Sequence, residues 1–142
     1  MAKNQNTVIT VRATINAPVS KVWKHWTTPE SIKAWNQASD DWHTTRATND
    51  LRKNGKYTFR MEAKDGSSGF DFGGTYDKIV PDEQIDSTLG DGRKVSVTFA
   101  SRGDKTEVIE SFEAEGTNPV EFQRQGWQAI LNNFKKFSES SK

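Results

Sequence analysis

The chain of 142 residues carries 20 Lys and Arg against 19 Asp and Glu, and it contains no Cys. This balance lacks the basic excess of nucleic-acid-binding proteins, while the absence of Cys excludes disulfides, thiolate zinc sites and cysteine nucleophiles. Only 32% of the residues are hydrophobic, but five Trp, two Tyr and eight Phe supply large areas for burial. We therefore expect residues 1–142 to form a single folded domain with a core of aromatic rings.

The N-terminal stretch MAKNQNTVIT has no apolar segment of the kind that a secretion signal requires. No other stretch approaches the roughly 18 consecutive apolar residues of a membrane-spanning helix. We expect a cytoplasmic protein that neither inserts into a membrane nor binds nucleic acid.

The first predicted elements are one strand and two short helices. Apolar and polar residues alternate over residues 8–15, which is typical of a half-buried strand. Pro18, at a first helical position, begins a short helix. Thr28 and Pro29 begin a second one, as its N-cap and its first-turn residue.

About six further strands are predicted before the last helix. The clearest alternation lies in GKYTFRMEA, whose Tyr57, Phe59 and Met61 share one face. Turns rich in Gly and Asp separate the segments. The predicted strands cover residues 42–50, 55–63, 70–80, 84–90, 93–101 and 105–114.

A long amphipathic helix is predicted over residues 119–138, with a length of about 30 Å. Its apolar side chains, among them Trp127 and Phe134, fall on one face. Strands with one apolar face and a helix with one apolar stripe need each other as cover. We therefore expect an α+β fold in which a curved antiparallel sheet of six to seven strands wraps the helix, with Gly73–Gly74 permitting the bend.

Six stretches together cover nearly the whole chain: INAPVSKVWKHWTTPESIKAWN, ASDDWH, GKYTFRMEAKDGS, GFDFGGTYDKI, TLGDGRKV and TNPVEFQRQGWQAILNNFKKF. In this order they resemble the helix-grip fold of the START and birch-pollen-allergen superfamily. More closely, the chain resembles bacterial and archaeal proteins of the family named after the activator of heat-shock-protein-90 ATPase. The set is specific as a fold signature and carries no agreed catalytic residues.

The superfamily includes carriers of hydrophobic ligands, aromatic polyketide cyclases, toxin-binding resistance proteins and co-chaperones. The resemblance therefore implies three classes of function: ligand binding, interaction with a chaperone, and catalysis. The leading expectation is non-catalytic binding of a small hydrophobic or aromatic ligand between the sheet and the C-terminal helix, without a cofactor. One alternative is an interaction module that activates a chaperone ATPase in the stress response. The other is a cyclase-like or hydrolase-like enzyme that uses polar residues of the cavity.

The inward faces of the predicted elements indicate which residues would line such a cavity, since core and pocket are one surface in this architecture. The expected lining residues are Trp35, Trp42, Tyr57, Phe59, Met61, Phe70, Phe72, Tyr76, Val97, Phe99, Trp127 and Leu131. Gly126 weakens the helix by about 1 kcal/mol relative to Ala. It either lets a strand pack closely or keeps the cavity open.

Asp41 and His43 lie in the densest polar-aromatic stretch, WNQASDDWH, and are candidates for polar positions in the cavity. A carboxylate and an imidazole suit acid–base chemistry near neutral pH. In the alternative, the Asp residues cap a turn and the Trp rings close the core. We expect no metal site, because His25 and His43 lack metal-ligand spacing and no Cys completes a set; His25 is expected to be solvated or partly packed.

Glu110 is the third polar candidate, because its position in the strand matches that of its apolar neighbours Val108 and Phe112. Alternation points it inward, unless a bulge or an edge position returns it to solvent. An inward carboxyl group must be hydrogen-bonded, paired, protonated or hydrated. Arg46 and Arg60 are the conceivable partners, and a raised pKa is the consequence of burial without one.

Overall fold

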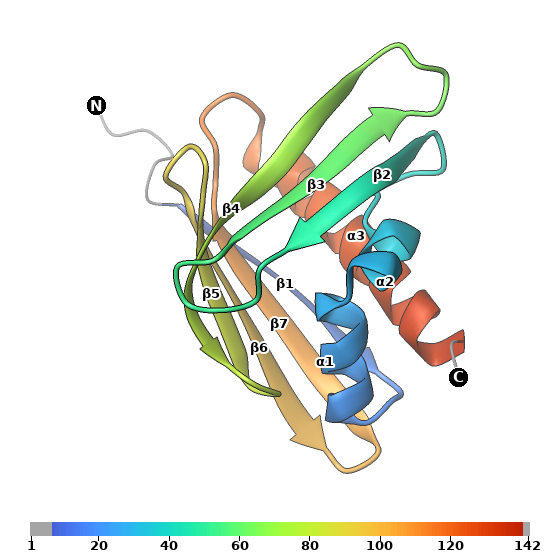
Figure 1. Cartoon of the computed structure of the whole chain (residues 1–142), viewed down its shortest axis with the longest axis vertical. Helices are drawn as coiled ribbons and strands as arrows, with labels where there is room; N and C mark the ends of the chain where they lie inside the picture. The colour runs from blue at the N-terminus through green and yellow to red at the C-terminus, as the bar shows by residue number, and fades with distance from the viewer. Residues whose placement is uncertain (1–6, 141–142) are drawn as a thin grey trace.

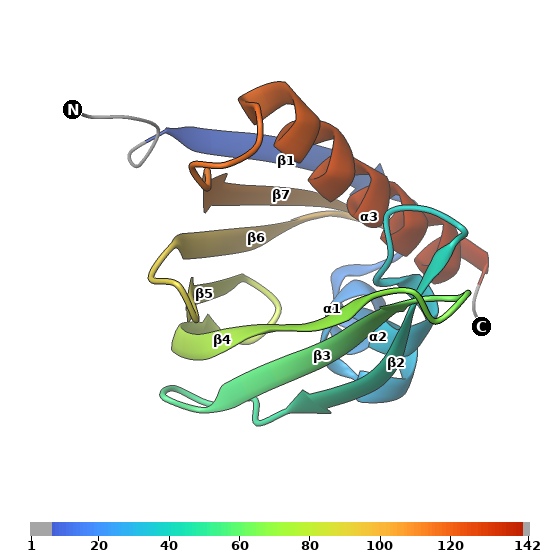
Figure 2. The ribbon, with the colours of Figure 1, turned by 90° about the horizontal axis from the view of Figure 1, so that it is seen from above.

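The computed structural model describes residues 7–140 and shows an antiparallel sheet curled around one long helix (Figure 1 and Figure 2). The strands are β1 (Val8–Ile15), β2 (Trp42–Asn49), β3 (Lys56–Ala63), β4 (Gly69–Val80), β5 (Gln84–Leu89), β6 (Lys94–Arg102) and β7 (Lys105–Glu113). The helices are α1 (Val19–Thr27), α2 (Pro29–Trp35) and α3 (Val120–Ser140). The predicted helix-grip arrangement is confirmed.

The strands of the sheet follow the order β1-β7-β6-β5-β4-β3-β2, so that β1 pairs with the last strand of the chain. From β2 to β7 each strand lies beside its neighbour in sequence. α1 and α2 carry the chain from one edge of the sheet to the other and close one end of the curl (Figure 2). α1 packs on β6, α2 on β2 and α3 on β1.

Gly73 and Gly74 lie where β4 passes very close to both of its neighbours. A Cβ atom on Gly73 would lie 2.1 Å from the carbonyl oxygen of Tyr57, and one on Gly74 would lie 2.4 Å from that of Thr88. No side chain fits at such distances unless the backbone moves. The pair was expected to permit a bend, and the structure adds that backbone of β3 and β5 occupies the space of the missing Cβ atoms.

The closed end of the curl is filled by aromatic rings. Trp26, Trp35 and Phe134 meet one another with ring centroids 4.9 to 5.0 Å apart, which joins α1, α2 and α3. Thr28 occupies the predicted N-cap position of α2, but its side chain makes no capping hydrogen bond. Its hydroxyl group instead donates to the carbonyl oxygen of Lys24, because the preceding turn of α1 lies within reach.

The two halves of α3 have different surroundings. Leu131, Phe134 and Ser138 in the C-terminal half are fully buried against the core. The N-terminal half lies over the open part of the curl, where α1 and α2 do not reach (Figure 2). Within residues 7–140, no helix is both long and apolar enough to cross a membrane.

Candidate functional site

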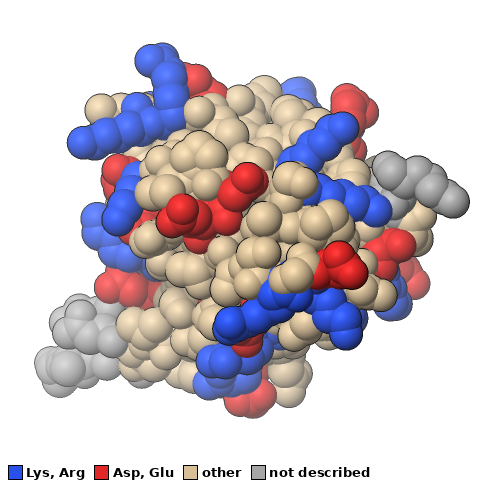
Figure 3. Space-filling view, turned by 90° about the horizontal axis from the view of Figure 1, so that it is seen from below, with Lys and Arg blue, Asp and Glu red and all other residues tan. Residues whose placement is uncertain are grey.

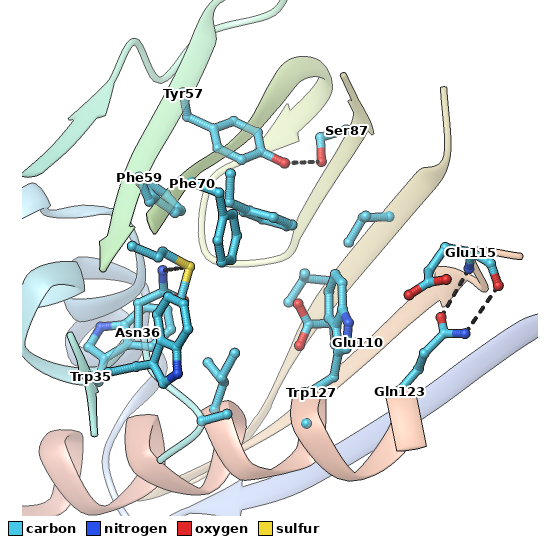
Figure 4. A pocket seen from close by; sticks show the side chains of 18 of the residues that line it. Trp35, Asn36, Tyr57, Phe59, Phe70, Ser87, Glu110, Glu115, Gln123 and Trp127 are labelled. Carbon is cyan, nitrogen blue, oxygen red and sulfur yellow. Dashed lines mark hydrogen bonds between the residues drawn. The ribbon is translucent and has the colours of Figure 1, made fainter. Parts of the chain in front are cut away.

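A cavity of about 610 Å³ lies between the inner face of the sheet and the N-terminal half of α3 (Figure 4). It is lined by Trp26, Trp35, Asn36, Ala38, Ser39, Trp42, Tyr57, Phe59, Met61, Phe70, Phe72, Tyr76, Ile85, Ser87, Val95, Val97, Glu110, Glu115, Asn118, Phe122, Gln123, Gly126, Trp127 and Ile130. Phe70 and Phe122 are 47% and 63% exposed, so they stand at the opening of the cavity toward solvent. The volume is that of a small-molecule site, for which about 300–1,000 Å³ is usual.

Trp127 forms the wall on the α3 side. Its indole ring stacks on the buried ring of Phe112, with centroids 3.8 Å apart and planes 12° from parallel. Phe72 of β4 meets the same indole edge-on at 6.0 Å. Because aromatic residues of two strands contact Trp127, its indole is held in one orientation and forms a fixed wall of the cavity.

Two tyrosines place hydroxyl groups along the β3–β4 side. The hydroxyl groups of Tyr57 and Ser87 lie 3.0 Å apart, and both side chains are buried. Tyr76 donates its hydroxyl hydrogen to Oδ1 of Asn49 at 2.6 Å. Burial raises the pKa of both tyrosines, so both stay neutral at physiological pH.

Glu110 of β7 lines the cavity and is only 9% exposed. Its strand neighbours are Val11 on β1 and Val97 on β6, and Figure 4 shows its carboxyl group in the cavity that Trp127 also lines. Within residues 7–140, no hydrogen bond or ion pair reaches this carboxyl group. Desolvation by burial raises the pKa of Glu110 to about 8.

The rim next to α3 is built by Glu115, Asn118 and Gln123. The side chain of Gln123 accepts a hydrogen bond from the Glu115 N–H and donates to the carbonyl oxygens of Glu115 and Asn118 (Figure 4). The carboxylate of Glu115 accepts hydrogen bonds from Asn118 and from the N–H of Thr117. The bonds from Asn118 lower the pKa of Glu115, which is therefore ionised and already partnered.

Most of the predicted apolar lining lies around this cavity, including every expected residue from β2, β3 and β4. Phe99 and Leu131 do not line it. Phe99 is covered by the rings of Trp23 and Trp26 in α1. Leu131 belongs to the C-terminal half of α3. Phe99 and Leu131 are both buried, because α1 and α2 occupy the closed end of the curl and leave no open space there.

Asp41 and His43 do not join Glu110 in the cavity. Asp41 is exposed and accepts a hydrogen bond from the hydroxyl group of Ser39 in the turn before β2. His43 lies opposite Glu62 in the β2–β3 ladder, and it alternates with Trp42, which does line the cavity. A strand places successive side chains on opposite faces, so the two neighbours cannot both point inward.

The two arginines considered as partners of Glu110 do not pair with it. Arg60 pairs with Glu62 and Asp71 on the outer face of the sheet, as its strand position predicts. Arg46 is exposed on β2. The buried carboxyl group therefore has the raised pKa expected for burial without a partner.

His25 is more buried than the sequence indicates, at 8% exposure. Its ring meets Phe137 edge-on at 4.9 Å, and Nδ1 lies 3.2 Å from the hydroxyl group of Ser31. Burial, followed by the charges of Lys21 and Lys24, lowers the pKa of His25. Within residues 7–140, no three His, Asp or Glu side chains gather as a metal site would require.

Sequence analysis missed several polar residues of the lining, among them Ser87, Gln123 and Asn118. A signal existed for two of them. Ser87 alternates in step with the buried Ile85, and Gln123 precedes Trp127 by one helical turn.

Gly126 faces open space, since a Cβ there meets no atom within 4 Å. Of the two alternatives for this residue, close packing of a strand and an open cavity, the structure supports the open cavity.

The chain is similar to a known protein family and to several solved structures. The profile of the family described as "Activator of Hsp90 ATPase homolog 1-like protein" matches residues 16–139. The solved structure of the AHSA1-like protein from Aeromonas hydrophila is similar, with a TM-score of 0.89 and 42% identity over 94% of this chain and 93% of its own. No curated protein matches the chain.

Two further solved structures extend the comparison. A protein from Cytophaga hutchinsonii is 52% identical over 93% of this chain and 92% of its own, with a TM-score of 0.81. The Aha1 protein of Colwellia psychrerythraea, described as a dimer, is 18% identical over 94% of this chain and 96% of its own, with a TM-score of 0.74. At that identity, the last similarity shows the fold alone.

Proposed function

Because this chain belongs to the family of Activator of Hsp90 ATPase homolog 1-like proteins and holds an open cavity lined by rings, we propose that it binds a small apolar or aromatic molecule there. The observation that carries the proposal is the cavity of about 610 Å³ beside Trp127. Apolar pockets with a few polar groups are typical of small-molecule sites. Ring walls held by stacking offer such a molecule a preformed surface, which reduces the entropy lost on binding.

A non-catalytic role is favoured by the separation of the polar candidates. General acid–base chemistry needs at least two suitable groups within reach of the same bound molecule. Glu110 lines the cavity, whereas Asp41 and His43 lie outside it. An enzyme mechanism built on these three residues therefore lacks its geometry.

The proposal is tested with N-phenyl-1-naphthylamine, an uncharged aromatic dye whose fluorescence rises in apolar surroundings. We expect saturable one-to-one binding and a raised melting temperature. Gly126→Leu fills the cavity without removing a contact, because the space beside this residue is open. The dissociation constant of the dye should be at least ~10-fold higher for this variant than for the unmodified chain, which corresponds to about 1.4 kcal/mol of overpacking.

The matched control is Gln125→Leu, which adds the same side chain at the next position of α3, where the residue is exposed. This variant should bind the dye as the unmodified chain does. Equal affinities of the Gly126→Leu and Gln125→Leu variants would place the dye outside the cavity. Absence of saturable dye binding to the unmodified chain would contradict the proposal.

Activation of a chaperone ATPase is the second candidate, and the family description favours it. It is tested by mixing the chain with the heat-shock-protein-90 homologue of its own organism and measuring binding and ATP hydrolysis. A stimulated ATPase would support this candidate. Unchanged hydrolysis together with no complex would remove it, and neither outcome depends on the dye.

A further inference from the structure

The charged side chains that line the cavity are all acidic. Glu110 and Glu115 are the two, and among residues 7–140 no Lys, Arg or His belongs to the lining. The outer surface differs, because the face in Figure 3 intersperses Lys and Arg with Asp and Glu. Glu115 is ionised and no described lining residue is a cation, so a ligand with a carboxylate or phosphate group would find no cationic partner in this cavity.

Glu110 is a polar side chain of this cavity that has no hydrogen-bond or ion-pair partner among residues 7–140. It is nine-tenths buried, lies between Val11 and Val97 in the sheet, and directs its carboxyl group toward the cavity (Figure 4). A buried carboxyl group is stabilised by a hydrogen-bond donor or a cation. The described residues supply neither, so in the empty cavity this group is protonated or hydrated, and a bound ligand can supply the partner from outside the chain.

The rings beside Glu110 suit a cation as well. Trp127 lines the same cavity, and Phe72 meets its indole edge-on at 6.0 Å. Aromatic faces attract ammonium groups, and Trp does so most strongly. Phe112 covers one face of the Trp127 indole, so only its remaining surface is available to a cation, and the carboxyl group of Glu110 supplies the main contact for an ammonium group.

We propose, resting on the proposed function, that the preferred ligand of this cavity carries a basic nitrogen. Its apolar body lies among the rings of β3, β4 and α3, and its ammonium group meets the carboxylate of Glu110 beside Trp127. Glu115 at the rim is already held by Asn118 and Thr117. It adds a negative potential at the opening rather than a second binding partner.

A change of protonation accompanies such binding. Other titratable groups in the lining are Tyr57 on β3, Tyr76 on β4 and Glu115 before α3; β5, β6, α2 and α3 contribute no charged side chain to it. In the empty cavity, burial raises the pKa of Glu110 to about 8, so this group is mostly protonated near neutral pH. An ammonium ion favours the carboxylate, so its binding should release up to about one proton.

The test compares three probes with one phenyl ring and one hexyl chain: 6-phenylhexylamine, 6-phenylhexanol and 6-phenylhexanoate. Isothermal titration near neutral pH gives their affinities, and titration in two buffers of different ionisation enthalpy counts the protons released. We expect the amine to bind at least ~10-fold more tightly than the alcohol, as hydrogen bonds between charged groups permit. The carboxylate should bind most weakly.

Glu110→Gln keeps the size of the side chain and removes its charge, so it should abolish both the preference for the amine and the proton release. Glu107→Gln is the matched control, because Glu107 lies on the outward face of the same strand and pairs with Arg102. This variant should retain the preference. The neutral alcohol should bind the Glu107→Gln variant as it binds the unmodified chain, and its binding to Glu110→Gln reports whether that variant keeps its cavity.

The outcomes separate the two proposals. Binding of the alcohol with no preference for the amine, or a preference that survives Glu110→Gln, would overturn the basic-nitrogen inference and leave ligand binding in place. Failure of all three probes and of the dye would overturn the proposed function and this inference with it. Amine preference with proton release, both lost in Glu110→Gln, would establish the inference.

Discussion

The indole of Trp127 and the ring of Phe112 lie 3.8 Å apart and nearly parallel, which joins α3 to β7 at the wall of the cavity. Replacing Trp127 by Ala removes this stack and enlarges the cavity. We expect the free energy of unfolding to fall by about 3 kcal/mol, the lower end for an aromatic-to-Ala change, because the residue is partly exposed. Urea denaturation followed by circular dichroism measures the loss.

Trp127→Phe provides the comparison, since it keeps a stacked ring. This variant should lose less than half as much stability as Trp127→Ala. Equal losses in the two variants would show that a stacked ring at position 127 contributes no stability.

Gly126→Ala should stabilise the chain. A Cβ at this helical position meets no atom within 4 Å, so the substitution brings no clash. Ala is favoured over Gly inside a helix by about 1 kcal/mol. Thermal and urea unfolding should show this gain, and a loss of stability would mean that the helix packs more tightly here than the structure indicates.

Gly74→Ala should have the opposite effect. The added methyl group would lie 2.4 Å from the carbonyl oxygen of Thr88, so β4 and β5 would have to separate. We expect a loss of about 3 kcal/mol or failure to fold, the upper end of the cost of overpacking. Gly116→Ala is the control, because a Cβ at Gly116 meets no atom within 4 Å and its effect should be small.

Glu110 should make stability depend on pH. Its pKa of about 8 in the folded chain exceeds the ordinary value of 4.5, so the folded state retains a proton that the unfolded state releases. Its contribution to stability is therefore complete below about pH 4.5 and is lost as the pH rises through about 8.

The Glu110→Gln variant isolates this dependence. Below about pH 4.5 its stability should equal that of the unmodified chain, whereas about one pH unit above 8 it should be more stable by up to roughly 5 kcal/mol. Urea denaturation at a series of pH values measures both. Parallel stability curves for the two proteins would show that Glu110 is hydrated rather than desolvated.

Much of this architecture follows from local patterns. The alternation that puts Glu110 in step with Val108 and Phe112 also puts its side chain inside the sheet, and the helical spacing of Trp127 and Phe134 puts both on the covered face of α3. The same alternation, applied to the neighbours Trp42 and His43, would have excluded His43 from the cavity. The grouping of polar and aromatic residues in WNQASDDWH therefore predicted the cavity residues less well than the alternation of side chains along a strand.

The sequence by itself determined the order of elements, the faces they bury and the inward direction of Glu110, because these depend on residues a few positions apart. Only the tertiary structure decided where the curl is filled and where it stays open. Phe99 and Leu131 have the same apolar pattern as the cavity residues, yet the rings of α1 cover Phe99, and Leu131 is fully buried. Whether an inward side chain meets another or meets empty space depends on how distant segments cross, and periodicity along one segment carries no such information.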